Sequence, residues 1–570
     1  FQQQKWAGAY GMAPNLFPVQ FSDGSWGYYP LVSNIENSPR SVATSGYELS
    51  TITRVFTDFA LEQNLDFITK GLVARGTISW DNQFNEGSRG ISDLHAVKNA
   101  YMLPEDGQIL YETAINATTG FDFYESRDWT TEAGNVSYTS RATEMSLQLF
   151  WGRQLGDHNV TVMGNWKRRI NAGNADLENR REDWVFRTTY DYKGRYFAEF
   201  NGAYNGSQKF SPDHRFVFFC SGALGWMLSE EKFMKKLKDK KIVDMFKIRG
   251  SIGEIGDDNA GARWAYLTGW EVLNNGNGFN MAIDGSASPF VGYKEATIAA
   301  PDLRWATVKK VNIGFDYAFL GGMFAGSFDW FRDDRYDIFI SGANRSVPSY
   351  YGAAMTPDIN KGKMKNHGFE IEVRFNKVLN NGMRFWANAN YTYAHNEIIE
   401  KDDPALIPNY RKAKGYSQGQ YWSFIDNGYI STYDELYSTP AREKDDSQVL
   451  IGDHYIVDFN GDGVVDETND QAPYGYTGTP EHTYNATIGW EWKGWSMFAQ
   501  LYGVTGVTRD VGLTSFNNKL LTVYDNGTWW NPVDGTGEVV VPRFTTQVSY
   551  NDGTQFLFDG SYFRLKNVED

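Results

Sequence analysis

Residues 186–204 read FRTTYDYKGRYFAEFNGAY, in which apolar and polar residues alternate on both sides of a short turn. The turn falls at Lys193-Gly194, and every second residue on either side of it shares one face. That face carries Phe186, Thr188, Tyr190, Tyr192, Tyr196, Ala198, Phe200, Gly202 and Tyr204, and the other carries Arg187, Thr189, Asp191, Glu199, Asn201 and Asn205. Alternation with a period of two predicts an antiparallel hairpin with one apolar face and one polar face.

The length of these strands separates a membrane barrel from a soluble sandwich. Sandwich strands are usually about 5–6 residues long, whereas the alternating runs here reach about 9–11 residues, which crosses a bilayer at a tilt. The aromatic residues also crowd toward the strand ends, where a membrane interface would place them. The pattern therefore predicts an all-β fold, a transmembrane antiparallel β-barrel.

Three further hairpins repeat the pattern. They pair Val311–Phe319 with Phe324–Trp330 across Gly321-Gly322, Phe369–Phe375 with Met383–Tyr393 across Asn380-Asn381-Gly382, and Tyr484–Trp492 with Trp495–Leu501 across Lys493-Gly494. Gly-Gly and Asn-Gly suit such turns because they tolerate positive φ. Between the hairpins, residues 81–140, 206–245, 332–366 and 397–482 read as long irregular connections. Short turns at one rim and long loops at the other are typical of membrane barrels. One connection predicts a helix over Ser229–Leu237 with Ser229 as its N-cap.

The composition agrees with a barrel and excludes other classes. The chain has 570 residues, of which 16% are aromatic, and its mean hydropathy is -0.50. No stretch approaches the roughly 18 apolar residues of a membrane helix, so a helical membrane protein is excluded. Cys220 is the one cysteine and cannot form an internal disulfide, which disfavours a disulfide-rich secreted domain. A net charge of -16 argues against nucleic acid as a partner and fits solvated loops and a hydrated lumen.

One loop has the spacing of a calcium site. The oxygen ligands expected of it are the side chains of Asp458, Asn460, Asp462, Asp466 and Asp470 and the backbone carbonyl of Val464. Gly463 falls where such loops turn sharply, but the last position holds Asn469 in place of glutamate, with Asp470 next to it. The alternative is a turn in which Asp and Asn side chains accept hydrogen bonds from their own backbone. We expect a bound Ca²⁺ ion that stiffens the loop.

Aromatic residues in turns and loops are the candidate substrate-binding residues. They are Trp26, Tyr28, Trp264, Tyr421, Trp422, Trp529 and Trp530. Aromatic rings stack on sugar faces and on peptide side chains. The alternative is that these rings pack the loops together or form interface girdles. We predict no catalytic residues, because the seven histidines are scattered and no nucleophile elbow follows a strand.

Several segments, in this order, resemble one family. They are Phe218–Ser221 with Leu224–Trp226 and Ser229–Glu231, Phe246–Gly253 with Gly256–Asn259, Pro301–Trp305 with Lys310–Asp316, Lys365–Glu370, Asp458–Gly463, and Asp559–Val568. Together they resemble the barrel of SusC/RagA-type TonB-dependent transporters of the Gram-negative outer membrane. The resemblance implies a barrel of about 22 strands in the intact protein. We expect residues 1–570 to be part of that barrel domain, with the N-terminal plug and the last C-terminal strands outside this sequence.

The resemblance also implies a function. It points to active import of oligosaccharides or oligopeptides across the outer membrane, energised by TonB through an N-terminal segment that this sequence does not contain. The implied partners are a SusD-like surface lipoprotein and outer-membrane lipid, and the resemblance allows a dimer of SusC–SusD pairs. Two alternatives stay open, a passive porin or adhesin barrel and a soluble carbohydrate-active β protein. Neither charge nor aromatic content distinguishes glycan cargo from peptide cargo.

Overall fold

The computed structural model describes the greater part of the chain. The described residues are 18–27, 37, 39–40, 43, 49–92, 99–102, 109–111, 114–115, 122–123, 130–133, 138–173, 177–259, 261, 263–273, 292–348, 356–444, 446–510, 530 and 553–569. Within them, no helix is both long enough and apolar enough to cross a membrane.

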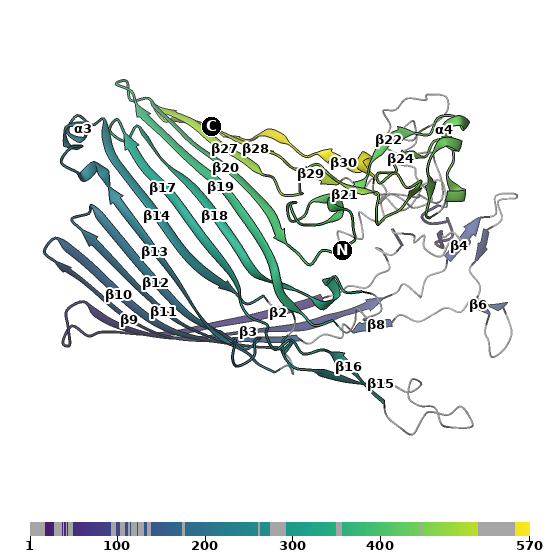
Figure 1. The fold of residues 1–570 in the computed structure, drawn as a ribbon, viewed down its shortest axis with the longest axis horizontal. Helices are drawn as coiled ribbons and strands as arrows, with labels where there is room; N and C mark the ends of the chain where they lie inside the picture. Colours follow the sequence, from purple (N-terminus) through teal and green to yellow (C-terminus); the bar gives the residue numbers. More distant parts are fainter. Residues whose placement is uncertain are drawn as a thin grey trace.

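One large curved sheet dominates the fold, and its strands follow one another in chain order (Figure 1). Its strands are β2 (Leu49–Asn64), β3 (Leu72–Ser92), β9 (Tyr138–Leu155), β10 (His158–Gly173), β11 (Asn179–Tyr192), β12 (Tyr196–Ser207), β13 (Phe216–Met227), β14 (Val243–Asp257), β17 (Ala306–Phe319), β18 (Phe324–Ile340), β19 (Ile359–Val378), β20 (Arg384–Glu400), β27 (His482–Trp492), β28 (Trp495–Thr505) and β31 (Tyr562–Glu569), with β8 (Thr130–Ala133) beside β3. Each neighbouring pair is antiparallel, and β2 and β31 lie at the two open edges of this 16-stranded sheet. The sheet, which we call the wall, is the predicted barrel surface.

The register confirms the predicted hairpins. Trp184 lies opposite Tyr204 and Phe186 opposite Gly202, so the apolar residues of β11 and β12 share a face. The turn residues Lys193 and Gly194 have φ values of 56° and 64°, as the tight hairpin turn requires. Gly202 is required at its position because a Cβ atom there would lie 2.6 Å from the Phe186 ring.

The wall strands are longer than the sequence predicts. The strands β11 and β12 have 14 and 12 residues, and β19 has 20. They extend beyond the apolar band, because the hydrogen-bond ladder continues into segments whose composition reads as loop. The prediction of one irregular connection over residues 206–245 is therefore wrong, since β13 lies within that range.

The short turns gather at one end of the wall, which we call the turn rim, and the long connections gather at the other end, which we call the loop rim (Figure 1).

The predicted helix is also different in the structure. In place of one helix over Ser229–Leu237, a 3-10 turn, η1 (Leu228–Glu230), precedes a short helix, α3 (Lys235–Asp239). Ser229 does not cap α3, because it lies within η1 and the N-cap position of α3 is Met234; the Ser229 side chain is buried. The connection that holds α3 lies at the turn rim (Figure 1).

Another helix, α4 (Tyr433–Ser438), lies in the long connection after β20. Thr432 and Glu435 form a capping box at its start, a sequence signal from which this helix could have been predicted.

Small strands and turns lie before the first wall strand and between the later ones. The small strands are β1 (Trp26–Gly27), β4 (Asn99–Met102), β5 (Ile109–Tyr111), β6 (Ala114–Ile115), β7 (Asp122–Phe123), β15 (Gly269–Leu273), β16 (Gly292–Thr297), β21 (Tyr421–Phe424), β22 (Asp426–Tyr429), β23 (Ala441–Arg442), β24 (His454–Ile456), β25 (Val464–Val465), β26 (Gln471–Tyr474), β29 (Thr508–Asp510) and β30 (Leu557–Asp559). Among the described residues, the other 3-10 turns are η2 (Gly342–Asn344), η5 (Asn409–Arg411), η6 (Asp446–Gln448) and η8 (Thr554–Phe556). The strands and turns between β20 and β27, residues 401–481, are called the loop layer.

The buried cores lie among the loops. One cluster joins Phe210, Phe219, Ala265, Ala300, Leu303 and Trp305, and the other joins Phe424, Ile456 and Val465 in the loop layer. By contrast, large apolar side chains on the outer face of the wall are exposed, with Leu224 at 72% and Trp184 at 51%. A contiguous exposed apolar face of this kind requires an apolar solvent, which is what a lipid bilayer provides.

Candidate functional site

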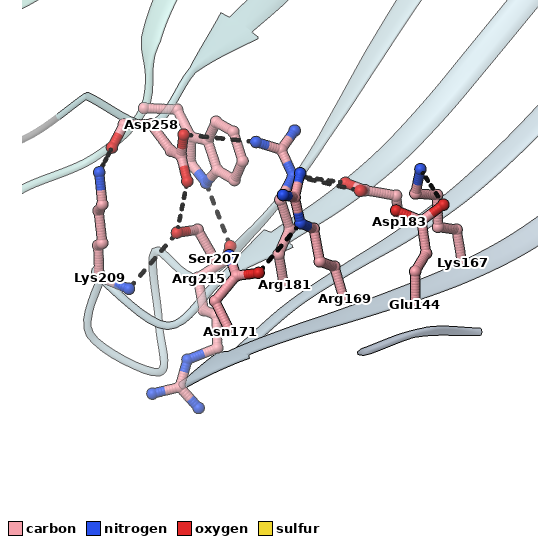
Figure 2. A network of polar contacts seen from close by, with 11 residues as sticks. Glu144, Lys167, Arg169, Asn171, Arg181, Asp183, Ser207, Lys209, Arg215 and Asp258 are labelled. Atoms are coloured by element: carbon pink, nitrogen blue, oxygen red, sulfur yellow. Dashed lines mark hydrogen bonds and ion pairs between the residues drawn. The ribbon is translucent and has the colours of Figure 1, made fainter. Parts of the chain in front are cut away.

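The polar face of the wall carries a row of opposite charges across adjacent strands (Figure 2). The ammonium of Lys167 on β10 lies 2.7 Å from the Glu144 carboxylate on β9. On β11, the guanidinium of Arg181 lies 3.2 Å from Asp183, which faces Lys167 in the strand register. Period-two alternation places every second residue of a strand on the same face. These charges therefore line the concave face of the wall, and the exposed apolar side chains lie on the opposite, outer face.

Asp258, just after β14, ties the next connection to this row (Figure 2). Its carboxylate accepts a hydrogen bond from the Ser207 hydroxyl at 2.8 Å and lies 3.4 Å from Arg181. Its backbone carbonyl accepts a hydrogen bond from Lys209 at 3.0 Å. The Trp305 ring lies under the Arg181 guanidinium, 5.4 Å from the ring centroid. These contacts hold the loops of the first buried cluster against the wall.

A second group of charges lies further along the same face. Arg249 on β14 makes two hydrogen bonds of 2.6 Å to the carboxylate of Asp329 on β18. The same guanidinium lies 3.2 Å from Asp316 on β17. A two-pronged guanidinium–carboxylate contact is strong and geometrically specific. Both carboxylates are therefore held as ion-pair partners, an arrangement that stabilises the wall and suits a hydrated lumen.

A cavity of about 660 Å³ lies at the loop rim beside the charge row. Its lining includes Tyr138, Ser140, Asn171, Asn179, Arg263 and Trp264. Asn171 accepts a hydrogen bond from Arg169 at 3.2 Å, so the cavity and the polar face share a residue. Two aromatic rings, two amides, a hydroxyl and a guanidinium can bind an uncharged polar ligand by stacking and hydrogen bonding.

Trp264 is the predicted aromatic that the structure brings to this cavity. Its backbone has a φ of +64°, a conformation that is strained for a large residue. The guanidinium of Arg263 lies 4.2 Å from the Trp264 ring centroid and donates to the backbone carbonyls of Leu177 and Glu178. Strained residues of this kind gather at functional sites. Arg263 is a lining residue that the sequence analysis missed, although its position next to Trp264 was a usable signal.

The other predicted aromatics lie elsewhere and are not brought together with Trp264. Trp26 lies half-buried in β1. Tyr421 and Trp422 lie in β21, where the Trp422 indole donates a hydrogen bond to the Tyr410 carbonyl at 2.9 Å. Trp530 is only 7% exposed, so its ring is packed rather than presented. Trp422 and Trp530 thus have the features of the loop-packing alternative. Tyr28 and Trp529 lie outside the described residues.

The predicted calcium loop connects β24 to β26, with β25 inside it. The Asp458 carboxylate accepts hydrogen bonds from the backbone N–H groups of Gly461, Asp462 and Gly463. The Asp462 carboxylate accepts from the Asn460 amide at 2.8 Å and from the backbone N–H of Val464 at 2.9 Å. Such side-chain-to-backbone bonds define the turn alternative. Across the described part of the chain, no three His, Cys, Asp or Glu side chains are grouped to hold a metal ion. The calcium site stays a prediction.

Asp470 is the buried centre of this loop. Its side chain is fully buried and accepts hydrogen bonds from the backbone N–H groups of Phe459, Asn460 and Asp466. Burial alone would raise the pKa of the neighbouring Asp466 carboxyl, but hydrogen bonds from Asn469 and Thr468, together with the charge of Arg411, hold that pKa below its usual value. Both carboxylates therefore hold the backbone of this loop in place by accepting hydrogen bonds from its N–H groups.

The comparisons with known proteins agree with this architecture. The family model described as TonB dependent receptor-like, beta-barrel, matches residues 9–566. The chain is 27% identical over 293 residues to the TonB-dependent receptor SusC of Bacteroides thetaiotaomicron, a match that covers 49% of this chain and 27% of SusC. It is 22% identical over 595 residues to the TonB-dependent receptor P26 of Formosa agariphila, which covers 99% of this chain and 57% of P26.

The fold is shared with a solved transporter. The structure of the RagAB peptide transporter aligns with a TM-score of 0.66 at 15% identity, covering 95% of this chain and 57% of that chain. At this identity the likeness shows the fold alone. The chain thus spans between about a quarter and three fifths of the length of these relatives. It belongs to the TonB-dependent receptor-like β-barrel family and is of the SusC/RagA type.

Proposed function

We propose that this chain forms the wall of an outer-membrane importer of oligosaccharides or oligopeptides that depends on TonB and works with a SusD-like lipoprotein. Family membership supports the outer-membrane location and the coupling to TonB. The observation that carries the proposal is the two-faced wall, with exposed apolar side chains outside and paired charges inside. Strands can span a membrane only in a closed sheet, which pairs every backbone group where water is absent, and the wall would form part of such a barrel.

In the proposed mechanism, cargo is first captured at the loop rim. The Trp264 and Tyr138 rings would stack on a sugar face or a peptide side chain, and Asn171 and Arg263 would donate hydrogen bonds. Release into the lumen would follow displacement of the plug by TonB. Because Glu144, Asp183, Asp316 and Asp329 of the polar face already have cationic partners, they would offer a hydrated surface without strong binding sites for uncharged cargo.

The test uses the full-length protein in its native outer membrane. Mass spectrometry of whatever co-purifies with the complex identifies the cargo as glycan or peptide. Uptake of that cargo should stop when the proton gradient is collapsed with an uncoupler. Continued uptake would contradict TonB dependence and favour a passive porin, and recovery of the full-length protein in the soluble fraction would defeat every barrel function.

We further propose that the loop Asp458–Asp470 binds Ca²⁺ through the side-chain oxygens of Asp458, Asn460, Asp462, Asp466 and Asp470 and the backbone carbonyl of Val464. The ligand types fit a hard cation, and the ion would stiffen the loop layer. Asp458→Ala combined with Asp462→Ala should abolish any stabilisation by added calcium. If the thermal stability of the unaltered protein is the same with calcium and with a chelator, the loop is only a turn.

A further inference from the structure

The connection between β13 and β14 is strongly basic, although the chain has a net charge of -16. Residues 228–242, here the basic segment, hold six lysines and three acids. Lys238 pairs with Glu230. The other five lysines are exposed, and none of them forms an ion pair with another described residue; they are Lys232, Lys235, Lys236, Lys240 and Lys241. The basic segment therefore presents uncompensated positive charge.

Glu231 fixes the basic segment on the outer face of the wall, the face that carries the exposed apolar side chains. Its carboxylate accepts hydrogen bonds from the Tyr196 hydroxyl at 2.5 Å and from the Trp226 indole at 3.1 Å. Tyr196 and Trp226 lie opposite each other on β12 and β13, and both side chains are exposed on the same face as Leu224. The segment is thus held beside the outer face at the turn rim, where α3 lies in Figure 1.

The basic segment also presents apolar side chains. Phe233 is 64% exposed, and Leu237 and Ile242 are exposed beside the lysines. The backbone carbonyl of Ile242 accepts a hydrogen bond from Leu320 in the next turn, whose side chain is exposed as well. Lysines around exposed Phe and Leu are the combination found in segments that lie in a membrane interface, with rings in the acyl boundary and ammonium groups among phosphates.

We propose that the basic segment binds the headgroups of anionic phospholipids, of the phosphatidylglycerol type, in the inner leaflet of the outer membrane. The inference rests on the proposed function only in placing the turn rim at the periplasmic surface. Charge complementarity identifies the ligand, because five unpaired ammonium groups attract phosphate headgroups and are neutralised by them. Phe233 inserts between the acyl chains, and Glu231 sets the height of the segment at the aromatic girdle.

The test measures lipid retention by the full-length protein. The protein is purified in a mild detergent with added phosphatidylglycerol or phosphatidylcholine, and native mass spectrometry counts the lipids that stay bound. We expect preferential retention of phosphatidylglycerol that decreases as salt is raised. Changing the five unpaired lysines to glutamine should reduce this retention on the order of tenfold. Inorganic phosphate at the same concentration should not compete, because it lacks the acyl chains that Phe233 contacts.

Matched variants separate charge from folding. Changing the same five lysines to arginine preserves the charge and should preserve retention. Lys401→Gln with Lys414→Gln removes lysines at the loop rim and should leave retention unchanged. Phe233→Ser should weaken binding of phosphatidylglycerol more than binding of its short-chain analogue, because Phe233 contacts the acyl chains.

Equal retention of phosphatidylglycerol by the unaltered protein and by the five-glutamine variant would overturn the proposal. If that variant retains lipid normally and also loses cargo uptake, the segment binds an acidic periplasmic protein instead. Failure of the proposed function is distinguishable, because a barrel that imports nothing still retains lipid through this segment.

Discussion

The wall and the loop layer satisfy their polar groups in opposite ways. In the wall, backbone N–H and C=O groups bond to neighbouring strands, so charged side chains pair with each other, as Arg249 does with Asp316 and Asp329. In the described part of the loop layer the strands form only short two-stranded ladders, and the Asp470 carboxylate accepts hydrogen bonds from three backbone N–H groups. Asp316 and Asp329 thus pair with a cation in the wall, whereas Asp470 organises backbone in the loop layer, according to which groups the backbone leaves unbonded.

The largest effect is expected at Asp470 in the loop layer. Asp470→Ala would leave three N–H groups without their acceptor beside a buried site, which should cost about 3 kcal/mol or more of loop stability. Hydrogen exchange of the amides of Phe459, Asn460 and Asp466 measures this cost. Asp458→Ala is the matched control, because its carboxylate also accepts three backbone N–H groups but is accessible to water. Equal protection in the two variants would break the comparison.

In the wall, Arg249→Met removes the cation that two carboxylates share. We expect a loss of about 2 kcal/mol, less than for a fully buried pair because the Arg249 side chain is 33% exposed. The midpoint of urea unfolding in detergent measures it. Adding Asp316→Asn and Asp329→Asn should recover most of the loss, since no unpaired charge then remains. An unchanged midpoint for Arg249→Met alone would mean that the wall does not depend on charge pairing.

Close packing of a glycine against an aromatic ring in the wall should contribute less to stability than the Arg249 ion pairs. Gly202→Ala places a Cβ atom 2.6 Å from the Phe186 ring and should cost about 1–2 kcal/mol through displacement of that ring. Gly164→Ala on β10 is the control, because a Cβ atom there has no heavy atom within 4 Å. Thermal melting of the two variants compares them, and a melting temperature for Gly202→Ala as high as for Gly164→Ala would contradict the packing.

The smallest effect concerns a pair at the boundary between the two regions. Lys361 on β19 donates to Asp402 at 2.6 Å, and this hydrogen bond holds the pKa of the Asp402 carboxyl below its usual value of 3.8. A lowered folded-state pKa contributes stability above pH 3.8, and this contribution is lost as pH falls through the folded-state pKa. Lys361→Met should therefore cost about 0.5–1 kcal/mol at neutral pH and much less in acid. A loss that is independent of pH would show that the pair contributes through packing alone.

The sequence predicted the wall well and the candidate site only in part. Trp264 was found as a loop aromatic, but its partners Tyr138 and Asn171 were not, because they come from distant strands with no shared motif. The inward burial of Ser229 was also missed, since a serine before Glu-Glu-Lys reads equally well as a cap. Trp422 was predicted from its place in a loop, and the sequence does not show the Tyr410 carbonyl that its indole contacts in the structure.

By itself the sequence determined the hairpins, their turns and the face of each side chain, because a period of two leaves one register that places all apolar residues together. It determined the basic segment as well, since charge is a property of composition. Only the tertiary structure decided which loop residues line the cavity and which side of the wall holds the basic segment. It also decided whether an aspartate binds a cation side chain or a backbone amide. Those outcomes depend on contacts between residues far apart in the chain, and no local pattern encodes them.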